Sequence, residues 1–131
     1  MLDTIWRVME LDFDAEEFLQ EHHVENIENI FIQGEERLLG KVNEKSGFNV
    51  LVSGNLNSKE NTIEILNFVT KNEKAFLYLQ QQGISSSFDI GCTVGSSDQY
   101  TKSISFNSSL LGLLSKYNID LEFSAYPASD E

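Results

Sequence analysis

The chain of 131 residues lacks several features that would assign it to a class of protein. Its single cysteine, Cys92, excludes an internal disulfide. It has one proline, nine phenylalanines and 40% hydrophobic residues, which is typical of a globular domain rather than of a disordered one. No apolar run approaches the roughly 18 residues of a membrane span, and the start of the chain lacks the apolar core of a secretion signal. We therefore expect one cytoplasmic domain over residues 1–131.

Positive charge is scarce and unevenly distributed. The chain has 9 Lys and Arg residues against 21 Asp and Glu residues, which gives a net charge of −12. Up to residue 36, eleven carboxylates are opposed by a single cation, Arg7, so this segment carries −10 of the total. Such a field repels nucleic acid and anionic membranes and attracts a basic protein over a distance. We expect a basic protein partner, no nucleic acid and no membrane.

Motifs that identify catalytic or metal sites are also missing. His22 and His23 are adjacent, and neighbours on a helix point about 100° apart, so they cannot share a metal as residues four apart do. Cys92 alternates with apolar residues and is expected to be buried. No serine lies in a GxSxG motif, and no glycine-rich phosphate loop is present. We expect no catalytic residue, no metal and no cofactor, and therefore a protein that is not an enzyme.

The first half of the chain combines strand patterns with one helical pattern. Residues 4–11 have apolar side chains on both faces, which predicts an inner strand covered on both faces, or one whose second face is partly covered. Asp14 has the position of a helix cap, with Glu17 three residues later. An apolar stripe then runs from Ala15 to His22. Residues 27–33, 37–42 and 48–52 predict three successive strands with turns between them.

The second half predicts more helix. Residues 59–82 predict a helical region with Ser58 as its cap and Gly83 as its end, which Asn72-Glu73 should either break into two helices or kink. Residues 88–94 alternate strictly and predict a strand, which turns at residues 95–99 and returns over 100–106. A helix over 108–117, capped by Asn107, precedes a last strand over 119–127. The predicted fold is α+β, a single domain with a mostly antiparallel sheet and helices packed on one face.

The acidic residues of the first segment are the candidate binding residues. Glu17 and Glu21 lie one turn apart on the predicted first helix, where like charges repel, and no Lys or Arg in that helix offsets them. The residues expected to bind a basic partner are Glu16, Glu17, Glu21, Glu25, Glu28, Glu35 and Glu36. The alternative is that these carboxylates only keep the protein soluble.

The C-terminal stretch SISFNSSLLGLLSKYNIDLEFSAY resembles the closing motif of a family of small bacterial domains of unknown function. Members of that family end in a strand, a leucine-rich helix and a strand that finishes near a tyrosine. The matching positions are Phe106, Leu110, Leu111, Leu114, Ile119, Leu121 and Tyr126. The segments FDAEEFL and SGFNVLVS look like the family's first half, so the resemblance spans most of the chain.

This resemblance implies an interaction role, because similar small acidic proteins accompany bacterial toxins as their immunity proteins. Immunity proteins against nucleases are commonly acidic, since nuclease toxins present a basic cleft. The resemblance thus implies an immunity protein that binds and neutralises a cognate toxin domain with a basic surface, such as a nuclease. An enzyme that uses acids in a cleft, with or without a divalent metal, and a small-ligand-binding domain that uses surface carboxylates are the alternatives.

Overall fold

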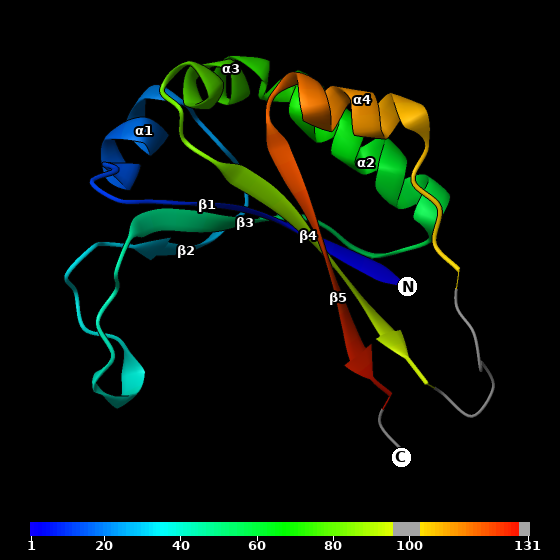
Figure 1. Ribbon diagram of the computed structural model, residues 1–131, viewed down its shortest axis with the longest axis horizontal. Coiled ribbons are helices and arrows are strands. Elements are labelled where there is room, and N and C mark those ends of the chain that lie inside the picture. The colour runs from blue at the N-terminus through cyan, green and yellow to red at the C-terminus, as the bar shows by residue number, and fades with distance from the viewer. Residues whose placement is uncertain (96–102, 129–131) are drawn as a thin grey trace.

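The computed structural model describes residues 1–95 and 103–128, and five strands within them form one sheet in the order β2-β3-β1-β4-β5 (Figure 1). The β2–β3, β3–β1 and β1–β4 pairs are antiparallel, whereas β4 and β5 run parallel. The strands are β1 (Leu2–Glu10), β2 (Ile27–Phe31), β3 (Ser46–Leu56), β4 (Ser86–Val94) and β5 (Ile119–Pro127). The sheet is therefore mostly antiparallel, as the sequence predicted.

The helices lie together on one face of this sheet (Figure 1). They are α1 (Ala15–Glu21), α2 (Ser58–Lys71), α3 (Glu73–Gln81) and α4 (Ser108–Lys116). The opposite face, called the open face below, has no helix over it among the described residues (Figure 1). This arrangement confirms the predicted α+β fold with helices on one face of the sheet. No helix of the described residues is long and apolar enough to cross a membrane.

The core forms between the helices and alternate residues of the central strands. On β1, the side chains of Leu2, Thr4, Trp6 and Val8 are buried, while those between them are half-buried or exposed. Trp6 is fully buried, and its ring centroid lies 4.6 Å from that of Phe76. Of the two predictions for the first strand, the one with a partly covered second face is therefore correct.

Asn residues begin or interrupt the longer helices. Asn57, rather than the predicted Ser58, caps α2, because its Oδ1 accepts from the Glu60 backbone N–H at 2.8 Å. Its Nδ2 also donates to the Glu60 carboxylate at 2.6 Å, so the oxygen and the nitrogen of the Asn57 amide each have a partner in Glu60. Asn72 separates α2 from α3, as predicted, and Gly83 follows α3 at a positive φ of 70°.

The segment between β2 and β3 differs from the prediction. Residues 37–42 do not form a strand; instead a 3₁₀ turn, Leu38–Gly40, lies at the tip of a loop that projects away from the sheet (Figure 1). Leu38 and Leu39 are 90% and 95% exposed. Leu39 has φ 66° and ψ 26°, a left-handed conformation that an extended strand does not contain. The predicted strand over 37–42 was wrong, because apolar residues normally indicate a buried strand, whereas these two leucines are exposed at the tip of a loop.

Two further predictions concern the second half of the chain. β5 covers the predicted residues, but its burial fades along the strand, from 6% exposure at Ile119 to 45% at Phe123, because its far end extends beyond the helices (Figure 1). Residues 103–106 are not a strand, and the rest of the predicted 100–106 strand lies outside the described residues. Most of the predicted 95–99 turn also lies outside them.

Candidate functional site

The first helix presents three of the seven candidate carboxylates. Asp14 caps α1 by accepting from the Glu17 backbone N–H at 3.0 Å, as its position in the sequence predicted. Ala15 and Phe18 are buried, and α1 packs against β2 and β3. The opposite side of the helix is left to solvent, where Glu16, Glu17 and Glu21 are exposed.

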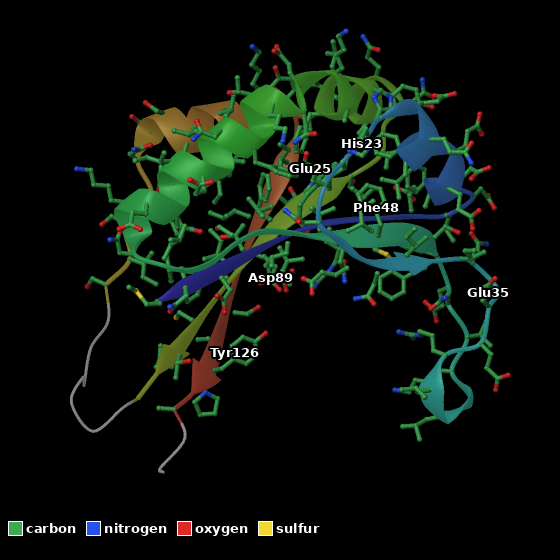
Figure 2. The ribbon with its side chains drawn as sticks, turned by 180° about the vertical axis from the view of Figure 1, so that it is seen from behind. His23, Glu25, Glu35, Phe48, Asp89 and Tyr126 are labelled. Atoms are coloured by element: carbon green, nitrogen blue, oxygen red, sulfur yellow. The ribbon has the colours of Figure 1, made fainter. Side chains whose placement is uncertain are left out.

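The other four candidates lie on β2 and on the segments either side of it, and they too are exposed. Glu25 precedes β2, Glu28 lies within it, and Glu35 and Glu36 begin the projecting loop. Since β2 is an edge strand and α1 packs against β2 and β3, the elements that carry the seven residues lie toward the β2 edge of the sheet (Figure 1). Figure 2 shows Glu25 near the helices and Glu35 in the projecting loop. We call this set, Glu16, Glu17, Glu21, Glu25, Glu28, Glu35 and Glu36, the acidic edge.

Cations from elsewhere in the chain moderate the acidic edge. Lys71 of α2 places its Nζ 3.3 Å from the Glu25 carboxylate, and this exposed pair is the one ion pair of the acidic edge within the described residues. Lys71 and Lys74 line the same hollow as Glu21. The chain thus brings positive charge close to acids that have no cation near them in the sequence. An exposed pair of this kind adds little stability.

The two histidines have different surroundings. His22, just after α1, is half-buried, with its ring centroid 4.8 Å from Phe18 and 5.2 Å from Tyr78. His23 is exposed and lines a hollow of about 190 Å³ with Glu25 and Lys71. Within residues 1–95 and 103–128, no group of three or more His, Cys, Asp or Glu side chains could hold a metal ion.

The polar side chains of the open face form a network that the sequence did not indicate. Arg7, at the centre of the sheet, donates from Nε to Asn49 Oδ1 at 3.2 Å. Its other nitrogens lie 3.7 Å from the Asp89 carboxylate and 3.9 Å from that of Glu122. Ser124 Oγ donates to Asp89 at 2.7 Å. Residues from β1, β3, β4 and β5 therefore meet around one guanidinium, and Figure 2 shows Asp89 on this face with Tyr126.

Two other chemically reactive side chains belong to the core. Cys92 is 3% exposed on the helix face of β4, as the alternation predicted, and therefore behaves as a small apolar residue. Tyr117, at the end of α4, donates its hydroxyl to Glu73 at 2.8 Å. This hydrogen bond, then burial and the charge of Glu73, raise the pKa of Tyr117 above its ordinary value. The higher pKa reflects a structural contact between α3 and α4.

Comparison with known proteins adds no assignment. The chain matches no protein family, no curated protein and no solved structure among those compared with it.

Proposed function

We propose that this protein binds and neutralises a basic partner protein through the acidic edge, and that the partner is the toxic domain of a bacterial toxin, such as a nuclease. The observation that carries this proposal is the exposure of all seven carboxylates, on elements that lie toward the β2 edge of the sheet (Figure 1). Six of them have no ion pair among the described residues, so their charge is available to a partner. A one-sided field accelerates the encounter with a basic protein and fixes its orientation.

The placement of the carboxylates on α1 lowers the cost of association with a partner. Glu16, Glu17 and Glu21 lie on a capped helix whose other side is buried against the sheet, so their positions are set before binding. Little conformational freedom is then lost when a partner docks on this side, which lowers the entropic cost of association. Glu28 lies on an edge strand, which places it beside backbone groups that have no further strand among the described residues.

The experiment is a binding titration against the product of the neighbouring gene, which this proposal requires to contain a basic toxin domain. Reversing both Glu17→Lys and Glu21→Lys should weaken binding at least about tenfold at low salt, mainly by slowing association. Because both residues are exposed, circular dichroism should show an unchanged fold. Raising the salt concentration should weaken the wild-type complex, since a Debye length of about 8 Å at physiological ionic strength already screens much of the steering.

The matched control is Asp120→Lys, compared with Glu17→Lys alone, because each changes the net charge by the same amount. Asp120 is exposed on β5, the opposite edge strand of the sheet. Lys71 and Lys74 cannot act as distant controls, since both lie beside Glu21 and Lys71 pairs with Glu25. Equal binding by wild type and the Glu17/Glu21 variant, with no dependence on salt, would show that the acidic edge only provides solubility.

A further inference from the structure

The only two arginines of the chain line the same hollow on the open face. Arg7 comes from β1 and Arg37 from the projecting loop, thirty residues later in the sequence. Lys45, where the loop returns to the sheet, lines it as well. Three of the nine Lys and Arg residues thus surround a hollow of about 530 Å³ that has a single carboxylate in its lining, that of Glu44. The charge in this hollow is opposite in sign to the net charge of the protein.

The floor of the hollow is the open face of β1 and β3. Met9 of β1 and Phe31 of β2 both pair with Gly47 of β3, from opposite sides. A Cβ atom at Gly47 would lie 1.8 Å from the Val8 carbonyl oxygen and 2.6 Å from the Met9 sulfur, so this position must be glycine. The Met9 side chain therefore lies over Gly47, and Met9 and Phe31 form an apolar part of the lining beside the polar pair Arg7 and Asn49.

The three cations differ in whether they already have a hydrogen-bond or ion-pair partner within the described residues. Arg7 is held by Asn49 and approached by Asp89 and Glu122, which lie on β4 and β5 and do not line the hollow. Arg37 and Lys45 are exposed and have no ion pair among the described residues. Arginine donates in a planar fork that matches carboxylate and phosphate oxygens. One oriented and two unpaired cations therefore face the same space.

The wall of the hollow is fixed by hydrogen bonds at the base of the loop. Asn43, which is 8% exposed, donates from Nδ2 to the Ile32 carbonyl at 3.1 Å. The Asn43 backbone also donates to the Glu35 carbonyl and accepts from the Gly34 N–H, both at 2.9 Å. The segments that present Arg37 and Lys45 are thus tied together before any ligand enters. A site that is already ordered loses less entropy on binding.

We propose that this hollow binds a small organic anion with an apolar body. A carboxylate or phosphate group would contact Arg37, Lys45 and Arg7, and the apolar body would pack against Met9 and Phe31. The volume lies within the range of pockets for small molecules. This function is independent of the acidic edge, because none of the seven carboxylates lines the hollow.

The test is a titration of the ¹⁵N-labelled full chain, followed by NMR, with four probes. Phenyl phosphate and benzoate carry both an anionic group and a ring, and they distinguish phosphate from carboxylate as the preferred group. Inorganic phosphate lacks the ring, and benzyl alcohol lacks the charge. We expect phenyl phosphate or benzoate to shift the amide signals of Met9, Phe31 and Lys45, with at least about tenfold tighter binding than either half-probe, since the ring and the charge-assisted hydrogen bonds each add affinity.

The matched variants remove two charges inside or outside the hollow. Arg37→Gln with Lys45→Gln should weaken binding of the better aromatic anion at least about tenfold, because charge-assisted hydrogen bonds are lost. Lys59→Gln with Lys116→Gln removes the same net charge from α2 and α4 and should leave binding unchanged. All four side chains are exposed, so both variants should fold, and the amide spectrum will verify this. Absence of wild-type binding, equal binding of benzyl alcohol or inorganic phosphate, or equal loss in both variants would overturn the proposal.

Discussion

The two faces of the sheet are built on different principles, and β1 contributes to both. Its helix face carries Trp6 and Val8, which are fully buried and surrounded by aromatic and aliphatic side chains. Its open face carries Ile5, Arg7 and Met9, which are half-buried. Arg7 belongs to the polar network across the strands, and Arg7 and Met9 line the cationic hollow. Apolar burial dominates the stability of folded proteins, whereas exposed polar groups add little to it. Among the described residues, the helix face therefore supplies most of the stability and the open face supplies less.

The largest expected difference between the faces is in the free energy of unfolding. Trp6→Ala should lower it by about 3–5 kcal/mol, because a fully buried ring is lost and a cavity remains. Ile5 is the neighbour of Trp6 in the sequence but lies on the open face. Ile5→Ala should lower the free energy of unfolding by about 1 kcal/mol, since its side chain is only half-buried. Urea unfolding of the two variants measures both values. Similar losses would show that the open face is covered in solution.

A second comparison concerns one asparagine on each side of the sheet, Asn61 of α2 in the helix layer and Asn49 of β3 on the open face. Asn61 is fully buried, and its Oδ1 accepts from the Thr4 hydroxyl at 2.6 Å and the Ser53 hydroxyl at 3.0 Å. Asn61→Ala should cost about 1–3 kcal/mol, because the buried Thr4 hydroxyl and the half-buried Ser53 hydroxyl lose their acceptor. Asn49→Ala on the open face should cost about 0.5 kcal/mol, because water can replace its hydrogen bond to Arg7. Urea unfolding tests this pair, and an equal cost would contradict the comparison.

The smallest expected effect is a dependence on pH within the helix layer. The pKa of Tyr117 is raised above 10.0 by its hydrogen bond to Glu73. Its neutral form is therefore favoured by folding, so this contribution to stability is full below pH 10 and is lost as the pH rises through the folded pKa. The difference in unfolding free energy between wild type and Tyr117→Phe should shrink at alkaline pH. A difference that is constant with pH would exclude this linkage.

The sequence predicted those elements whose signal is local. The alternation of residues 88–94 predicted β4, and the caps Asp14 and Asn107 were identified because each lies directly before a helical pattern. Asn57 was missed because the adjacent Ser58 is an equally good cap by residue type. The order of the strands could not be predicted, since the parallel pairing of β4 with β5 depends on how α4 packs rather than on either strand's pattern.

The candidate sites show the same limit. The exposure of the acidic edge was predictable, because its helix residues are opposite an apolar stripe. The Glu25–Lys71 pair and the hollow with Arg7 and Arg37 were not, since each joins residues that are distant in the sequence. A count of charge along the chain does not detect a cluster whose cations come from distant parts of the sequence. For this reason the sequence indicated an acidic protein and not the cationic hollow within it.

The tip of the projecting loop has a consequence for how this chain tolerates change. Leu38 and Leu39 bury almost nothing, and the left-handed backbone of Leu39 costs an L-residue roughly 1 kcal/mol or more. Selection for a stable fold alone would replace Leu39 with glycine or asparagine, which adopt this conformation readily. The tip is therefore the position where foreign sequence, such as an epitope tag or a reporter attachment site, can be inserted without disturbing the core.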